Sequence, residues 1–156
     1  MRFLIFIVFI FYINPSYSAT DDWTSYGKGS GGGHFSKADE ITPENVKKLE
    51  RVWVHRSGDY KGGANSAGVK GGEYQTSFQA TPLLVDNTLF YCTSYNRVFA
   101  LDPETGKEKW VFDPKLKKDG RAILACRGLS SWKDETKSSS EKCHHRIMGA
   151  VSYTHL

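Results

Sequence analysis

The chain has 156 residues, of which 39% are hydrophobic, 24% charged and 13% aromatic, with a formal net charge of +4. Its 15 glycines and four tryptophans favour a turn-rich β protein over a helical bundle. No basic stripe interleaved with aromatic residues occurs in the sequence, which argues against nucleic acid as a partner.

The first 18 residues have the pattern of a signal peptide. Arg2 precedes an apolar run at residues 3–13, Pro15 follows the run, and small residues precede Ala19. The run is shorter than the ~20 residues that a membrane-spanning helix needs. We therefore expect residues 1–18 to direct export and to be cleaved before Ala19, with an uncleaved anchor as the alternative.

A short helix and several strands are predicted next. Thr42 can cap a helix at residues 42–49, and Pro43 suits its first turn. Residues 52–55 are predicted to form a strand, and the glycine- and lysine-rich residues 58–72 a surface loop. Four short strands are predicted at residues 81–85, 89–93, 98–101 and 109–112. Residues 123–132 begin a further segment, and the polar residues 133–142 are predicted to form a loop.

The three cysteines would meet an oxidising compartment after export. Cys92 lies in an apolar stretch and is predicted to be a buried thiol. Cys126 and Cys143 flank the polar loop and could close it as a disulfide. Because the count is odd, one thiol stays free or pairs with a cysteine outside this chain.

The most specific motif is a strand, a tight turn and a second strand that ends on tryptophan. It reads Ala100-x-Asp102-x-x-Thr105-Gly106-x-x-x-Trp110. This pattern resembles the tryptophan-docking repeat of dehydrogenases that use pyrroloquinoline quinone (PQQ), which are eight-bladed β-propellers. The resemblance implies that Asp102, Thr105, Gly106 and Trp110 are structural, with the turn satisfying backbone donors and the indole docking between blades.

The resemblance covers nearly all of residues 23–147. Four segments carry it: Trp23-x-x-Tyr26-Gly27, Phe78-Gln79-Ala80-Thr81-Pro82-Leu83, Cys92-Thr93-x-x-x-Arg97 and Cys126-Arg127-Gly128-Leu129. Among PQQ enzymes this set is most similar to the membrane-type glucose, quinate and polyol dehydrogenases. We therefore expect an all-β fold in which residues 19–149 form an N-terminal fragment, about one blade plus a leader segment, of an eight-bladed propeller.

The resemblance also assigns candidate site residues. Arg127 matches an arginine that is directed at the quinone, and Gln79 matches an inner-strand position that contacts PQQ. Tyr95 and Arg97 match positions near the substrate entrance, where glucose-type enzymes can carry His at the position of Tyr95. The alternatives stay open at each position: a surface ion pair for Arg127, a satisfied strand amide for Gln79, a packed aromatic for Tyr95 and an exposed loop charge for Arg97.

The implied chemistry needs groups that this chain does not supply. In the family PQQ lies beside Ca²⁺, the ion and an arginine polarise a quinone carbonyl, and an Asp takes the alcohol proton as hydride passes to the quinone. The catalytic Asp and the calcium ligands are expected downstream, so no metal ligand is assigned here. The implied substrate is an alcohol, sugar or polyol, and the implied acceptor is ubiquinone or another carrier, with peripheral membrane association possible.

The end of the chain is interpreted separately. Residues 150–156 can be back-translated into a common sequencing-adapter sequence, so we expect native sequence to stop near Gly149. The competing interpretation is a strand with alternating Val151, Tyr153 and His155.

With the export signal, the resemblance implies a periplasmic dehydrogenase whose isolated fragment is inactive and poorly stable. The alternatives are a non-catalytic propeller scaffold of the outer-membrane assembly type and a secreted one-blade binding module.

Overall fold

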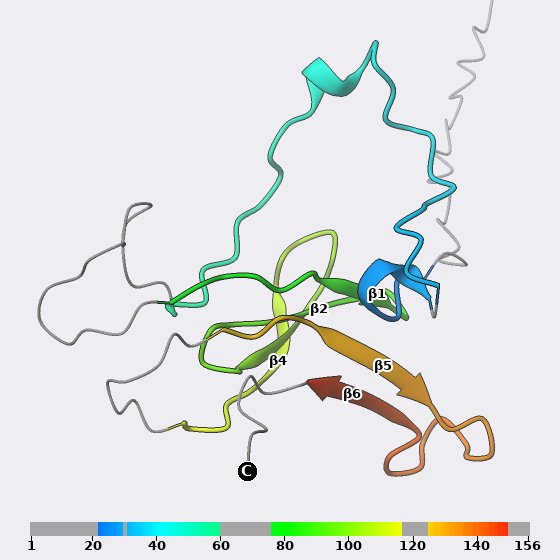
Figure 1. Ribbon diagram of the computed structural model, residues 1–156, viewed down its shortest axis with the longest axis vertical. Coiled ribbons are helices and arrows are strands. Elements are labelled where there is room, and N and C mark those ends of the chain that lie inside the picture. The colour runs from blue at the N-terminus through cyan, green and yellow to red at the C-terminus, as the bar shows by residue number, and fades with distance from the viewer. Residues whose placement is uncertain (1–21, 30, 60–75, 117–124, 150–156) are drawn as a thin grey trace, which may run out of the picture.

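The structure is a computed structural model that describes residues 22–29, 31–59, 76–116 and 125–149 (Figure 1). The predicted signal peptide, most of the predicted loop at residues 58–72 and the predicted adapter-derived end lie outside these residues. No helix within the described ranges is both long enough and apolar enough to cross a membrane.

A four-stranded antiparallel sheet forms the centre of the structure. It consists of β1 (Leu83–Val85), β2 (Thr88–Cys92), β3 (Val98–Leu101) and β4 (Glu108–Phe112), which neighbour one another in chain order. Asp86 and Asn87 join β1 to β2 with φ values of 47° and 51°. Both residue types tolerate this left-handed region, and such a pair gives a tight hairpin turn. The four strand predictions are confirmed, with ends displaced by no more than two residues.

A second, two-stranded sheet follows the first. It pairs β5 (Leu129–Lys133) with β6 (His145–Gly149) in antiparallel register. Residues 134–144 form the connection, which contains all of the predicted loop at residues 133–142 except Lys133, the last residue of β5. The strand β6 has no counterpart among the sequence predictions. Its mixture of charged, apolar and glycine residues lacks a clear alternation, and its pairing with β5 is what defines it.

Two predictions on the N-terminal side are corrected. Only Val46–Lys48 is helical within the region predicted as a helix, as the single 3-10 turn η2 at the far point of a wide arc (cyan in Figure 1). The Thr42 amide there donates to the Asn45 side chain, 2.8 Å away, so Asn45 organises this turn. Residues 52–55 form no strand, because they have no ladder partner among the described residues and contact the sheet through side chains.

Apolar side chains cover the four-stranded sheet on both faces. One face packs toward β5 and β6 in a cluster made by Leu83, Val85, Phe90, Cys92, Ala100, Cys126 and Leu129. The opposite face carries Tyr91, Phe99 and Leu101, with Trp53 packed against them. A sheet buried on both faces is typical of a layer within a stack of sheets. The edge strand β4 is exposed along its whole length, and Trp110 keeps 44% of its surface accessible.

The indole of Trp53 packs against the turn between β3 and β4. Asp102 Oδ1 accepts hydrogen bonds from the Thr105 amide at 2.8 Å and the Thr105 hydroxyl at 2.7 Å. Gly106 has a φ of 69°, and a Cβ atom there would lie 2.6 Å from the Trp53 ring. The Trp53 Nε1–H donates to the Pro103 carbonyl at 3.0 Å. The glycine is therefore required both by the backbone conformation and by the approach of the indole.

Candidate cofactor and substrate site

The two residues expected to bind the cofactor lie on neighbouring segments. Thr81 and Gly128 form a parallel bridge just before β1 and β5 begin. Gln79 lies two residues before this bridge on one segment, and Arg127 lies one residue before it on the other. Both side chains are exposed. The structure thus brings two distant parts of the sequence to the same end of the two sheets.

Arg127 combines a fixed backbone with a solvent-facing side chain. Its neighbours Cys126 and Leu129 are buried, with 3% and 4% of their surface accessible. Among the residues that the structure describes, none forms a hydrogen bond or ion pair with the Arg127 guanidinium. The exposed Gln79 amide donates to the Ser77 hydroxyl at 2.8 Å. A forked cation and a carboxamide at one edge can together bind carbonyl and carboxylate oxygens.

The predicted disulfide between Cys126 and Cys143 is wrong, because Cys126 has a different partner. Cys126 is bonded to Cys92, with 5.9 Å between their Cα atoms, and Cys143 is free and exposed. The reason is packing, since Cys92 ends β2 and Cys126 precedes β5 inside one apolar cluster. Cys143 lies in the connection between β5 and β6, outside that cluster. The predicted burial of Cys92 is confirmed, but as half of a disulfide that ties the first sheet to the segment of Arg127.

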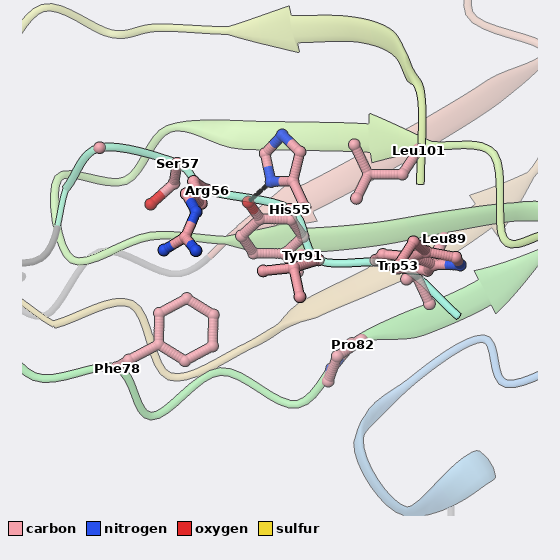
Figure 2. Close-up of a pocket in the computed structure, with 11 residues that line it drawn as sticks. Trp53, His55, Arg56, Ser57, Phe78, Pro82, Leu89, Tyr91 and Leu101 are labelled. Atoms are coloured by element: carbon pink, nitrogen blue, oxygen red, sulfur yellow. Dashed lines mark hydrogen bonds between the residues drawn. The ribbon is translucent and has the colours of Figure 1, made fainter. Parts of the chain in front are cut away.

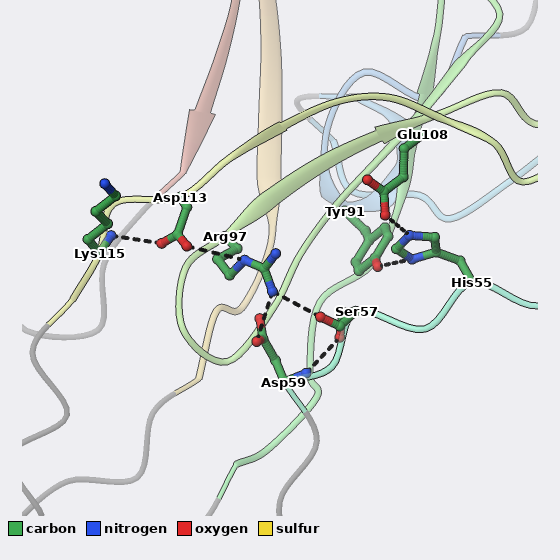
Figure 3. Close-up of polar contacts among 8 residues, drawn as sticks. All are labelled: His55, Ser57, Asp59, Tyr91, Arg97, Glu108, Asp113 and Lys115. Atoms are coloured by element: carbon green, nitrogen blue, oxygen red, sulfur yellow. Dashed lines mark hydrogen bonds and ion pairs between the residues drawn. The ribbon is translucent and has the colours of Figure 1, made fainter.

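The two residues expected at the substrate entrance line a common hollow of about 290 Å³ with Asp59, Asp113 and Lys115. Arg97 Nη1 donates to the Ser57 carbonyl at 2.9 Å and to Asp59 Oδ1 at 3.0 Å, as Figure 3 shows. Its Nε lies 3.6 Å from Asp113 Oδ2. The guanidinium is therefore engaged by carboxylates and by backbone, and it fastens residues 57–59 to the sheet. Tyr95 is 4% exposed and contributes a buried wall.

A larger groove of about 630 Å³ lies on the face of the sheet that carries Tyr91 and Leu101 (Figure 2). The segment 53–58 forms one wall, and Phe78, Pro82, Leu89, Tyr91 and Leu101 line the remainder. Sequence reasoning missed this groove, because it depends on how a segment without regular secondary structure lies across β2 and β3.

His55 links the groove to the edge strand. One ring nitrogen, Nδ1, is hydrogen bonded to the Tyr91 hydroxyl, and the other, Nε2, lies 2.8 Å from Glu108 Oε1 (Figure 3). A carboxylate can only accept, so Nε2 carries the proton and Nδ1 accepts from the tyrosine when the imidazole is neutral. Burial, followed by the nearby charge of Glu108, raises the pKa of Tyr91 to about 12. The Tyr91 phenol therefore stays protonated and donates to His55 at neutral pH. No sequence motif pointed to His55.

The histidines and acidic residues of the described ranges do not assemble a metal site. Within those ranges, no three or more His, Cys, Asp or Glu side chains come together in a group that could hold an ion. His144 and His145 interact with protein groups, since Nδ1 of His144 lies 3.1 Å from the Asp134 carbonyl and Nε2 of His145 lies 2.7 Å from Ser131 Oγ.

The segments that carry Gln79, Arg127 and the tryptophan motif lie in one family match. A family model described as "PQQ: Glucose/ethanol/alcohol dehydrogenase, beta-propeller domain" matches residues 23–156. The chain belongs to this PQQ dehydrogenase β-propeller family. Its membership confirms the predicted all-β propeller fragment and the resemblance from which that prediction came.

Curated relatives and a solved structure agree with the family assignment. Quinoprotein glucose dehydrogenase A of Acinetobacter calcoaceticus is 36% identical over 146 residues, which is 86% of this chain and 17% of the relative. Quinate/shikimate dehydrogenase (quinone) of Acinetobacter baylyi is 37% identical over 109 residues, 70% of this chain and 12% of the relative. The quinohemoprotein alcohol dehydrogenase of Comamonas testosteroni superimposes with a TM-score of 0.53 at 27% identity, covering 71% of this chain and 15% of that one. The chain spans less than a fifth of the length of each of these proteins.

Proposed function

We propose that this chain is the N-terminal part of a longer, periplasmic quinoprotein dehydrogenase that oxidises an alcohol, sugar or polyol with PQQ as cofactor. The observation that carries the proposal is the parallel bridge between Thr81 and Gly128, which sets the segments of Gln79 and Arg127 side by side. Family membership supports a PQQ-dependent parent enzyme, and the curated relatives named above act on glucose or on quinate and shikimate.

The chemistry of the two side chains fits the cofactor. PQQ is an ortho-quinone that carries carboxylates, so it presents oxygen acceptors along its rim. The Arg127 guanidinium would donate to a quinone oxygen and hold positive charge beside it, while the Gln79 amide would donate to a second oxygen at the rim. When bound, PQQ would accept hydride from the substrate carbon. Neither side chain needs to move a proton in this role.

The remaining parts of the proposal concern the complete gene product. The calcium ligands and the Asp that takes the substrate proton are proposed to lie in the part of the protein beyond this chain. Ubiquinone or another carrier is proposed as the electron acceptor. Export by residues 1–18 would bring the protein to the periplasm, where it would work either free or peripherally attached to a membrane.

The test uses the complete gene product, supplied with PQQ and Ca²⁺. Arg127→Ala should weaken PQQ binding roughly 10- to 150-fold, because a charge-assisted hydrogen bond contributes about 1.5 to 3 kcal/mol. The PQQ affinity of Arg127→Lys should fall between those of the wild type and Arg127→Ala, because an ammonium keeps the positive charge but cannot donate two parallel hydrogen bonds as a guanidinium does. Arg51→Ala, which removes another exposed arginine, is the control and should bind as the wild type does.

Equal PQQ affinities for Arg127→Ala and Arg51→Ala would contradict the role given to Arg127. A wild-type gene product that binds no PQQ would overturn the dehydrogenase proposal and favour a non-catalytic propeller scaffold.

A further inference from the structure

We propose that the disulfide between Cys92 and Cys126 is a positioning device that holds Arg127 at the PQQ site. The inference rests on the proposed function and adds to it two residues that would act by positioning Arg127. The bond joins the end of β2 to the residue directly before Arg127, so it connects the first sheet to the start of the second.

Arg127 is held on both sides of its own backbone. On one side Cys126 is bonded into the apolar cluster and is 3% exposed. On the other side Gly128 forms the bridge to Thr81, and Leu129 is buried as β5 begins. The Arg127 side chain between these points is exposed, and it has no hydrogen-bond or ion-pair partner among the described residues. The backbone therefore sets the direction in which the Arg127 side chain leaves the chain.

Without the covalent bond, that direction would depend on weaker contacts. The strand β5 starts only at Leu129, and within the described part of the chain one bridge, Thr81 to Gly128, pairs the segment before it with the residues that lead into β1. A short segment held by one bridge and by packing has fewer restraints than a segment that is also covalently bonded. A misplacement of about 1 Å at a reacting group can lower a rate about 100-fold, so a covalent restraint next to the donor has a functional effect.

The first step of the test is to map the disulfide in the oxidised gene product by mass spectrometry of unreduced peptides. A peptide pair linked through Cys92 and Cys126, with Cys143 as a free thiol, is expected. A pair linked through Cys126 and Cys143, or three free thiols, would overturn the inference.

The second step is a double-mutant cycle on PQQ affinity in the complete gene product. Cys92→Ala/Cys126→Ala should weaken PQQ binding roughly 10-fold or more. In that background Arg127→Ala should cost several-fold less affinity than it does in the wild type, because the guanidinium is no longer held in place. Cys143→Ala is the matched control and should change neither value. If the double alanine variant does not fold, Cys92→Val/Cys126→Ala refills the apolar site and serves in its place.

The outcomes separate this inference from the proposed function. If the wild type binds no PQQ, both fail. If the wild type binds PQQ and Arg127→Ala weakens it, but the disulfide variant binds as the wild type does, only the inference fails. It also fails if the cost of Arg127→Ala is unchanged in the disulfide-free background, since the bond would then add stability without placing the arginine.

Discussion

Replacing Gly106 with alanine should release Trp53 from the turn between β3 and β4. Gly106 has a φ of 69°, and the Cβ of an alanine would lie 2.6 Å from Cε3 and 2.7 Å from Cδ2 of the indole. Neither atom belongs to a flexible chain end, because both are in the fused ring. The ring must therefore move away, and its hydrogen bond to the Pro103 carbonyl at 3.0 Å is lost.

The magnitude follows from two contributions. An alanine in the left-handed region costs about 1 to 2 kcal/mol, and a lost hydrogen bond costs about 0.5 to 1.5 kcal/mol. The midpoints add to about 2.5 kcal/mol, which corresponds to a roughly 70-fold increase in local opening of the turn. Gly58 offers a matched control, since its φ is 77° and a Cβ atom at that position would have no neighbour within 4 Å among the described residues. Gly58→Ala carries strain of the same kind without the contact to Trp53.

Hydrogen exchange followed by mass spectrometry measures this opening directly. The amide of residue 106 donates to the Asp102 carbonyl at 2.9 Å, and the Asp102 amide donates to the Lys107 carbonyl at 2.8 Å. Peptides that contain these amides should exchange roughly 70-fold faster in Gly106→Ala and at the wild-type rate in Gly58→Ala. Equal exchange of the turn in the two variants would show that the clash with Trp53 does not open the turn. An unchanged effect of Gly106→Ala in a Trp53→Ala background would show the same.

Two further predictions depend on titration. The hydroxyl and amide of Thr105 donate to Asp102 and lower the pKa of that carboxyl below its ordinary value of 3.8, so its contribution to stability is present at neutral pH and is lost as pH falls below about 4. Protection of the turn should therefore decline as pH falls below about 4 in the wild type but not in Asp102→Asn, and equal declines would count against this role. For Tyr91, the difference in phenolate absorbance between wild type and Tyr91→Phe should have a midpoint at about 12. The protonated phenol makes its full contribution to the free energy of unfolding below pH 10, and that contribution is lost as pH rises toward about 12. A midpoint near 10 would show that the phenol is not buried as described.

The sequence predicted the features that depend on nearby residues. The strands β1 to β4 follow from short apolar runs separated by turn residues, and Asp86 and Asn87 adopt the left-handed conformation expected of their types. The motif from Ala100 to Trp110 identified both the hairpin and the family, because its turn chemistry is compact and specific.

Features that depend on distant contacts were not predictable in the same way. The spacing of Cys126 and Cys143 across a polar loop suggested a bond, but burial of Cys92 in the same cluster decides the pairing. His55 had no motif around it, and its role depends on Tyr91 and Glu108 from two different strands. Arg97 lines a hollow together with Tyr95, and its hydrogen bond to Asp59 is a tertiary contact that no local pattern could predict.

Equilibrium titration of the complete gene product with PQQ in the presence of Ca²⁺ tests PQQ dependence most directly. Saturable binding is expected, followed by PQQ-dependent oxidation of an alcohol, sugar or polyol with an artificial electron acceptor. Absence of saturable binding by a folded gene product would show that the protein is not a PQQ dehydrogenase.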